Sequence, residues 1–308
     1  MKTETRSFYQ AAVERTVLRI AETLDEALDL AALARGAALS PFHFHRIFRG
    51  MVGETPLEMH RRLRLERAAW QLLERDTAIT TIAFEAGYET HEAFTRAFRQ
   101  AYGNPPSAFR LNAAGVRAGC ERPQQIELAA RSGVHFRHEA PTPSLVRFLI
   151  GEAIMNVTIE EMPEFRLATV RHVGPYHRIS EAFARLGALA GPAGLFQGPP
   201  PKMLAIYHDD PETTAPENLQ SDAGLTVTAG VRVPDGTVEM TIPAGRYAHA
   251  THVGPYTELG DAWNRLMGGW LPQSGHRVGD GPTYEVYRNN PTNAAPHELI
   301  TDLYLPVA

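Results

Sequence analysis

A single glutamate lies among aromatic residues near the end of the chain, in the segment YEVY (284–287). Alternate side chains of a strand point to the same face, so Glu285 and Tyr287 share one face. A carboxylate beside aromatic rings attracts a lipophilic cation through its charge and through cation–π contact. The candidate ligand-binding set is therefore Glu285, Tyr287, Trp263, Tyr207, Tyr176 and Tyr256. The same residues also fit an ordinary aromatic core with a solvated glutamate, and position alone leaves both interpretations open.

The pentapeptide HVGPY occurs at 172–176 and again at 252–256, which marks a repeat with an offset of 80 residues. The repeat continues beyond the pentapeptide, so that Tyr207 aligns with Tyr287. From about Val157 each half follows the order strand, turn, helix, strand, strand. Two such halves packed about a pseudo-twofold axis leave a groove between them, and we expect the carboxylate and the aromatic rings to line that groove.

A second repeat, with an offset of 50 residues, lies in the first third of the chain. Residues 40–60 align with residues 90–110 without a gap, and phenylalanines, arginines, a glycine and a proline stay in register. Each unit is expected to hold two short helices separated at a glycine, Gly36 in the first and Gly87 in the second. The predicted helices are 24–36 and 40–53 in the first unit, then 79–87 and 90–103 in the second. Ser and Thr stand where the second helix of each unit begins, as helix N-caps do.

The second helix of each unit has one apolar arc and one polar arc at about 100° per residue. The apolar arcs hold Phe44, Ile47 and Phe48, then Phe94, Ala97 and Phe98. The polar arcs hold Phe42, His45, Arg46 and Arg49, then Glu92, Thr95, Arg96 and Arg99. Arginine pairs with guanine edges and with phosphates in a major groove, so two such faces favour DNA recognition over a merely solvated surface.

Residues 59–75 join the two units and have a helical pattern with several basic residues. A helix of about 19 residues spans nearly 30 Å, close to the ~34 Å between successive major-groove faces of a duplex. Such a spacer can present both polar faces to one side of the same DNA molecule.

The segment from LSPFHFHRIFRG to GNPPSAFR resembles the DNA-binding domain of AraC/XylS-type transcription regulators. The match includes the Ser-Pro cap, the connecting R-L-x-x-A, the I-A-x-x-x-G-[YF] turn and the closing Phe109-Arg110. This resemblance implies tandem helix-turn-helix units whose second helices enter the major groove. It implies base contacts from Phe42, His45 and Arg46, then from His91, Glu92, Thr95 and Arg96.

Residues 155–308 resemble the GyrI-like effector-binding domain. The resemblance rests on HVGPY, on W-x-x-L, on Y-E-V-Y followed by N-x-P, and on the closing Y-L-P-V. It implies that Glu285 is a buried acidic residue facing lipophilic cations, with Trp263 and Tyr287 as aromatic lining. The identity of the ligand does not transfer.

The amino-acid composition is that of a globular protein: 44% of the residues are hydrophobic and 21% are charged. The single cysteine, Cys120, excludes an intramolecular disulfide and a cysteine-based metal cluster. No metal or cofactor motif is present, and neither a signal peptide nor a membrane-spanning run is recognised. A cytoplasmic protein without a membrane partner is expected.

The fold class predicted is multidomain, with an all-α tandem helix-turn-helix domain and an α+β pseudo-symmetric domain. The predicted domains are a DNA-binding domain (1–112), a linker (113–153) and an effector-binding domain (154–308). The predicted function is a transcription regulator with double-stranded DNA, a lipophilic or cationic effector and RNA polymerase as partners. A small-molecule hydrolase that uses Glu285 as general base, or a module that sequesters its ligand, remains the alternative; activation and repression are not distinguished.

Overall fold

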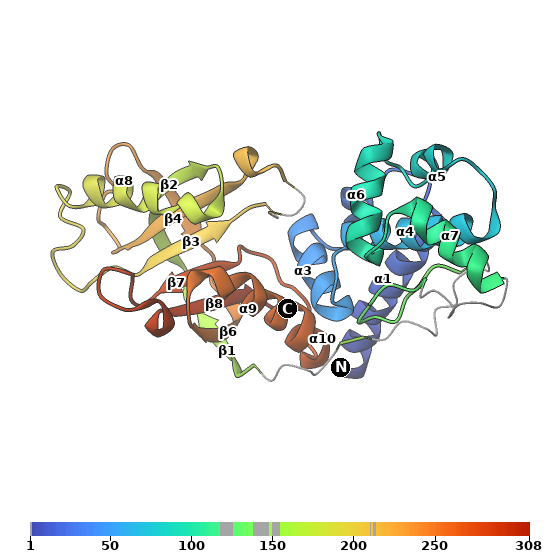
Figure 1. Cartoon of the computed structure of the whole chain (residues 1–308). Coiled ribbons are helices and arrows are strands. Elements are labelled where there is room, and N and C mark those ends of the chain that lie inside the picture. Colours follow the sequence, from blue (N-terminus) through green and yellow to red (C-terminus); the bar gives the residue numbers. More distant parts are fainter. Residues whose placement is uncertain (1, 118–125, 138–147, 150–154, 210, 212–213) are drawn as a thin grey trace. The chain divides into compact units, whose positions relative to one another are not determined.

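The computed structural model describes residues 2–117, 126–137, 148–149, 155–209, 211 and 214–308. The chain separates into two compact units, and each is described by itself (Figure 1). One unit is helical and comprises Gln10–Leu39 and Phe48–Leu149. The other comprises Met1–Tyr9, Ser40–Ile47 and Ile150–Ala308 and carries the β-sheet. Cys120 and most of the linker segment SLVRFLIG (144–151) lie outside the described residues.

Seven helices are described before residue 118: α1 (Lys2–Glu22), α2 (Leu30–Gly36), α3 (Pro41–Val52), α4 (Pro56–Glu74), α5 (Ile79–Glu85), α6 (His91–Tyr102) and α7 (Pro106–Arg117). The pairs α2–α3 and α5–α6 are the two predicted units, and α4 is the 19-residue spacer. The sequence placed the first helix from residue 24, whereas α2 begins only at Leu30. The reason is local: the Asp29 carboxylate caps the helix by accepting from the Ala32 amide at 2.9 Å.

Side-chain caps fix where the second helices begin, as the sequence predicted. The Thr90 hydroxyl accepts from the Ala93 amide at 3.1 Å and starts α6. The Ser40 hydroxyl lies 3.3 Å from the His43 amide at the start of α3. α4 begins with a capping box in which the side chains of Thr55 and Glu58 each accept from the other residue's amide.

The two interhelical turns differ in which residue takes the left-handed conformation. Gly87 has φ +77°, as predicted for a glycine that ends a helix. The helix α2 ends at Gly36, where the sequence predicted a helix stop, but the positive φ of this turn falls on Ala38, at 56°. The first turn thus places a non-glycine residue in a conformation that costs about 1 kcal/mol.

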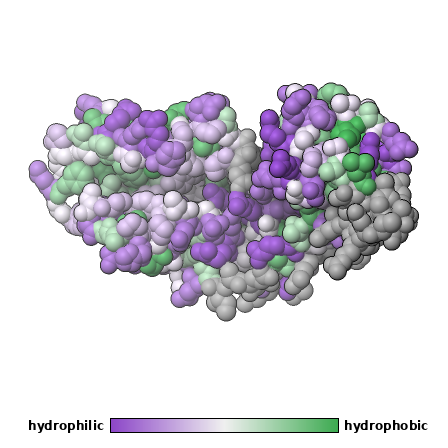
Figure 2. Space-filling view, viewed as in Figure 1, coloured by the Kyte–Doolittle hydropathy of each residue, from purple (hydrophilic) through white to green (hydrophobic). Residues whose placement is uncertain are grey.

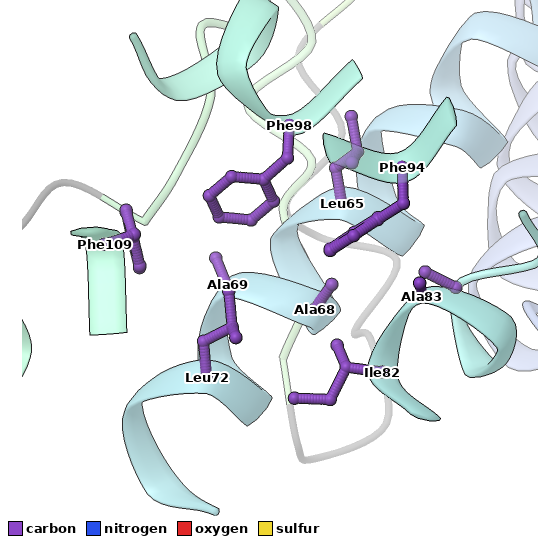
Figure 3. Close-up of a cluster of buried hydrophobic side chains, with 10 residues drawn as sticks. Leu65, Ala68, Ala69, Leu72, Ile82, Ala83, Phe94, Phe98 and Phe109 are labelled. Atoms are coloured by element: carbon purple, nitrogen blue, oxygen red, sulfur yellow. The ribbon is translucent and has the colours of Figure 1, made fainter. Parts of the chain in front are cut away.

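The core of the second helix-turn-helix unit is a cluster of buried side chains from α4, α5, α6 and α7 (Figure 3). Phe94 and Phe98 of α6 are fully buried, and their ring centroids lie 5.4 Å apart. The Phe98 ring also meets Phe109 of α7 edge-on, at 5.2 Å. The apolar arc that the sequence assigned to α6 therefore faces α4, except for Ala97, which is half-buried at the edge of the core.

Residues 126–137, which the sequence assigned to a linker, pack on the helical unit around one buried carboxylate. Glu66 of α4 is 1% exposed and accepts from the Leu128 amide at 2.9 Å and the Phe136 amide at 2.8 Å. It also lies 3.1 Å from the His135 ring and 3.1 Å from the Arg62 guanidinium. The second half of α4 is thereby tied to chain that lies 62–70 residues further on.

The sheet unit holds eight described strands: β1 (Val157–Met162), β2 (Phe165–Val173), β3 (Met203–Tyr207), β4 (Gln220–Val227), β5 (Val238–Ile242), β6 (Gly245–Val253), β7 (Tyr284–Tyr287) and β8 (Ile300–Pro306). The helix α8 (Ser180–Ala190) belongs to the first half. In the second half, α9 (Leu259–Asn264), the π-helix η5 (Arg265–Trp270) and α10 (Leu271–Ser274) follow one another. Each half also has a leading strand, β1 or β5, that the sequence pattern did not distinguish.

All eight strands form one antiparallel sheet in the order β1-β6-β8-β7-β3-β4-β2-β5. Exchange of each strand for its repeat partner gives the same order in reverse, so a pseudo-twofold axis passes between β3 and β7. The halves interlock, because β1 pairs with β6 of the second half and β5 pairs with β2 of the first. At the axis, Ala205 of β3 stands opposite its own repeat partner, Glu285 of β7.

The two faces of the central strands are distinct. Leu204 and Ile206 of β3 and Val286 of β7 join one cluster with Tyr284. The opposite face packs against α8, whose Ala182 and Leu186 are buried. Ala205, Tyr207, Glu285 and Tyr287 alternate with the first set, as the period of a strand requires.

Candidate functional site

The Glu285 side chain is the buried acid at the centre of the sheet unit and is 2% exposed. Its Oε1 accepts from the Trp263 indole N–H at 2.7 Å. Its Oε2 accepts from the Tyr287 hydroxyl at 2.8 Å. Both donors are neutral groups, so they hold the carboxylate in place without cancelling its charge.

Burial raises the pKa of Glu285, and the hydrogen bonds from Trp263 and Tyr287 oppose that rise only in part. Burial, and then the nearby Glu285 carboxylate, raises the pKa of Tyr287 and Tyr207 well above the usual value. The two phenols therefore stay protonated and act as hydrogen-bond donors. A buried carboxylate among neutral donors favours a ligand that brings positive charge.

The two HVGPY turns deliver one tyrosine each to the same site. Gly174 and Gly254 adopt φ of +135° and +146°, after which Tyr176 and Tyr256 begin short 3₁₀ helices. The Tyr176 ring meets Tyr207 edge-on at 4.7 Å. In the second half, the Tyr256 ring meets Tyr287, the repeat counterpart of Tyr207, at 5.3 Å. The repeated pentapeptide thus places a pair of rings on each side of the axis.

A cavity of about 930 Å³ lies over this face of the sheet. All six residues of the predicted ligand-binding set line it: Tyr176, Tyr207, Tyr256, Trp263, Glu285 and Tyr287. Figure 2 shows the sheet unit hollowed between the half that carries α8 and the half that carries α9. A volume of this size accommodates a drug-sized molecule.

Further lining residues were not in the predicted set. The largest of them is Phe183 of α8, whose ring meets Tyr287 edge-on at 5.7 Å. Phe183 is the repeat partner of Trp263, so the alignment of the two halves contained the signal that places it here. Ile179, Met203 and Leu259 add apolar surface, and Asn289 and Asn290 add polar groups shortly after the end of strand β7. Arg46 of α3 also lines the cavity, with its guanidinium 5.9 Å from the Trp263 ring centroid.

Two repeat-related aspartates, Asp222 of β4 and Asp302 of β8, lie outside the cavity and are held by cations. Asp222 binds Arg171 at 2.6 Å and His208 at 2.6 Å. Asp302 binds Arg288 at 2.5 Å. These are ion pairs within the sheet. Among the described residues no group of three or more histidine, cysteine, aspartate and glutamate side chains is arranged to hold a metal ion.

The predicted DNA-contacting residues of α6 form one exposed stripe. Glu92, Arg96 and Arg99 are exposed, and His91 and Thr95 are half-buried beside them. The buried Phe94 and Phe98 lie on the opposite side of the helix. The surface over α6 is mainly hydrophilic (Figure 2).

The predicted residues of α3 are less uniform in exposure. Phe42 and Arg46 share one face, with the guanidinium 4.7 Å from the ring centroid, and both are half-buried, as is Arg49. His45, assigned to the outer arc, is buried and 3% exposed. Its contact with DNA stays a prediction, as do those of the other residues in the set.

No helix among the described residues is both long and apolar enough to cross a membrane.

Comparison with known families assigns both parts of the chain. Residues 33–112 match a family described as a helix-turn-helix domain. Residues 155–308 match the family described as GyrI-like small molecule binding domain. Both resemblances seen in the sequence, AraC-type in the first part and GyrI-like in the second, are confirmed, and so is the multidomain fold class.

Individual relatives match one part each. A DNA gyrase inhibitor of Yersinia enterocolitica is 37% identical over 138 residues, which are 43% of this chain and 85% of that protein. An uncharacterized HTH-type transcriptional regulator of Bacillus subtilis, YbfP, is 39% identical over 103 residues, 33% of this chain and 35% of that protein. The chain thus spans about a third of that regulator's length.

A solved structure similar to the sheet unit is the crystal structure of the EcmrR C-terminal domain, at 22% identity and a TM-score of 0.44, covering 51% of this chain and 99% of that chain. The duplicated sheet and the family match agree, and the chain belongs to the GyrI-like family. It joins the small-molecule-binding domain of that family to an AraC-type helix-turn-helix DNA-binding domain, which is the domain organisation of a transcription regulator.

Proposed function

We propose that the effector of this regulator is a lipophilic or amphipathic cation, bound in the cavity over Glu285. The observation that carries the proposal is the pairing of Glu285 with two neutral donors, Trp263 and Tyr287, inside an aromatic cavity. Glu285 makes no salt bridge among the described residues, although the charge of Arg46 acts on it. A bound cation can supply that salt bridge, and ring faces attract it further. The cost of keeping a charged carboxylate buried is then recovered on binding.

The test is a thermal-shift titration with tetraphenylphosphonium, a lipophilic monovalent cation. The intact protein is expected to gain stability as RT ln(1 + [L]/Kd), and Glu285→Gln is expected to lose most of that gain. Glu181→Gln is the matched control, because Glu181 is an exposed carboxylate on α8 paired with Arg178. Equal stabilisation of Glu285→Gln and the unaltered protein would reject the charge assignment.

On the DNA side, we propose that α3 and α6 enter successive major grooves, with Arg46 and Arg96 at base edges. The exposed stripe of α6 and the capped starts of both helices support this placement. A mobility-shift assay compares the unaltered protein with Arg46→Ala and Arg96→Ala on a duplex selected from a random pool. Loss of about 1–3 kcal/mol per base-contacting arginine is expected. Unchanged affinity in both variants contradicts the assignment.

RNA polymerase is the further partner proposed, because a DNA-bound regulator alters transcription by acting on the enzyme that transcribes. Transcription in vitro from the selected duplex, with and without the cation, measures that action. Ligand that binds tightly without any change in transcript level would instead support sequestration.

The raised pKa of Glu285 favours a second candidate, hydrolysis of a small electrophile with Glu285 as general base. Turnover of a panel of activated esters and lactones by the intact protein, lost in Glu285→Gln, would establish it. Absence of turnover with cation binding retained favours the effector site.

A further inference from the structure

A second cleft, of about 880 Å³, lies entirely within the helical unit between α4, α6 and the turn that follows α5. Its apolar lining includes three small residues of α6, Ala93, Ala97 and Ala101, together with leucines and alanines of other segments. Its polar lining includes two arginines of α4, Arg61 and Arg64, and one acid, Glu89. The run HRRLRLER (60–67), in which these arginines occur, does not line the cavity over Glu285.

Arg61 and Arg64 differ from the other arginines of this run. Arg62 is held by Glu54 and Glu66, and Arg67 by Asp25 and the Glu85 carbonyl. Among the residues that the structure describes, neither Arg61 nor Arg64 makes an ion pair or a hydrogen bond, and the Nε of Arg64 is buried without a partner. Arg61 and Arg64 thus have no salt-bridge partner among the described residues, although Glu89 also lines the cleft and the charge of Asp25 acts on Arg64 at longer range.

The position of Arg64 is built into the turn beside it. Gly87 has φ +77°, and a Cβ on Gly87 would lie 1.9 Å from the Arg64 Nη2. The guanidinium therefore lies flat against the glycine backbone, where only the absence of a side chain admits it. Burial, and then repulsion from Arg67, lowers the pKa of Arg64, and the charge of Asp25 opposes this effect in part.

The cleft opens beside the DNA-facing stripe of α6. Residues 96 and 97 are about 100° apart around a helix axis, so the side that carries Ala97 adjoins the side that carries Arg96. Gln100 is exposed and also lines the cleft, at the boundary between the two sides. A duplex seated on α6 would therefore bring its backbone to the mouth of the cleft.

We propose that this cleft binds the sugar–phosphate backbone of the duplex between the two major-groove segments, with Arg61 and Arg64 contacting phosphates. The proposal rests on the proposed placement of α6 in the major groove. Phosphate contacts position a protein on DNA without reading sequence, and each releases condensed counterions. The two arginines therefore set affinity and register, while Arg96 contributes to the choice of sequence.

The experiment measures the dissociation constant against salt concentration for the double variant Arg61→Gln/Arg64→Gln, on the selected duplex and on a scrambled one. Each lost phosphate contact is expected to reduce the slope of log K against log [salt] by roughly 0.9. Affinity falls equally for both duplexes, so their ratio stays unchanged. Arg61→Lys/Arg64→Lys keeps the charge and is expected to retain most of the slope.

Arg75→Gln is the matched control, since Arg75 caps the C-terminus of α4 outside the cleft and pairs only loosely with Glu85, at 3.8 Å. Its slope is expected to equal that of the unaltered protein. A double glutamine variant that is folded by circular dichroism and keeps the full slope overturns the proposal, as does one that changes the ratio between the two duplexes. If instead the unaltered protein binds neither duplex, it is the major-groove placement that fails.

Discussion

The hydroxyl oxygens of Tyr207 and Tyr287 lie 3.0 Å apart, although the two residues are separated by 80 positions. They are repeat partners, and their contact falls on the pseudo-twofold axis of the sheet. Tyr287 donates onward to Glu285, which stands opposite Ala205. Among the described residues, the acidic group at this axis therefore belongs to the second half, and the charge in the cavity is not symmetric.

A second carboxylate at the axis should destabilise the fold. Ala205→Glu would place it directly across the strand pair from Glu285, where like charges oppose ionisation of one another. We expect the melting temperature at pH 7 to fall, by about 2–4 °C for each kcal/mol of repulsion. Ala205→Gln separates the effect of size from that of charge. The double variant Ala205→Glu/Glu285→Gln should regain stability relative to Ala205→Glu, and no recovery would argue against an electrostatic origin.

Stability should depend on pH through Glu285 itself. The pKa of this carboxyl is raised in the folded protein from 4.5, so the folded state holds its proton at pH values where the unfolded chain has lost it. The contribution of Glu285 to the free energy of unfolding is therefore fully present below pH 4.5 and is lost as pH rises through the pKa of the folded state. Thermal melts without ligand should show Glu285→Gln gaining on the unaltered protein as pH rises. A constant difference across that range would contradict the prediction.

Asp302 should make stability depend on pH in the opposite direction to Glu285. Burial alone would raise its pKa, but hydrogen bonds, first from Arg288, outweigh burial and hold the pKa below 3.8. Stability from this group is present above pH 3.8 and is lost on acidification. Asp302→Asn should cost about 1–3 kcal/mol at pH 7, measured by urea unfolding, and less at pH 3. Asp235→Asn, at an exposed ion pair, should change little at either pH.

The ring cluster of the helical unit should dominate its stability. Phe98 is fully buried among three other rings, so Phe98→Ala should cost about 3–5 kcal/mol in chemical denaturation. Leu111→Ala is the comparison, because Leu111 is 72% exposed and should change stability by no more than about 0.5 kcal/mol. Equal losses in the two variants would place the core elsewhere.

The length of α4 should fix the spacing of the two halves of the DNA site. Its 19 residues span close to one helical turn of DNA, so two groove-reading helices need half-sites on the same side of the duplex. Insertion of about 5 base pairs between the half-sites turns one of them to the far side. Binding in a mobility-shift assay should weaken roughly tenfold or more. Insertion of about 10 base pairs should not restore it, because this moves one half-site ~34 Å further along the duplex, beyond the reach of α4.

Periodicity and caps made the helix-turn-helix pairs predictable, since α6 alternates buried phenylalanines with exposed arginines and starts at a threonine cap. The helix α1 also has buried apolar residues at helical spacing, Val13, Val17 and Ile20. The strand β1 was harder to distinguish. It is an edge strand whose glutamates blur the alternation of a buried face, and its partner, β6, lies in the other half of the repeat.

The internal repeat made the aromatic lining of the cavity predictable, because it aligned Tyr176 with Tyr256 and Tyr207 with Tyr287. The packing of residues 126–137 around Glu66 could not be predicted in the same way. Residues 126–137 have no periodic pattern, and their amides reach a carboxylate more than sixty residues earlier. Every residue except proline has a backbone amide, so a contact made by an amide cannot be predicted from the residue type. The domain limits 1–112, 113–153 and 154–308 remain predictions.

Interlocked strands and an axial Ala205–Glu285 pair constrain how such a receptor can arise. A homodimer of half-length chains with this sheet would present each axial residue to its own copy, so an acid there would face an identical acid. Gene fusion frees the two copies to mutate separately, and one can stay alanine while the other becomes charged. The proposed effector, with a cationic end and an apolar end, would then bind to a cavity whose two halves carry different charge at this pair of positions.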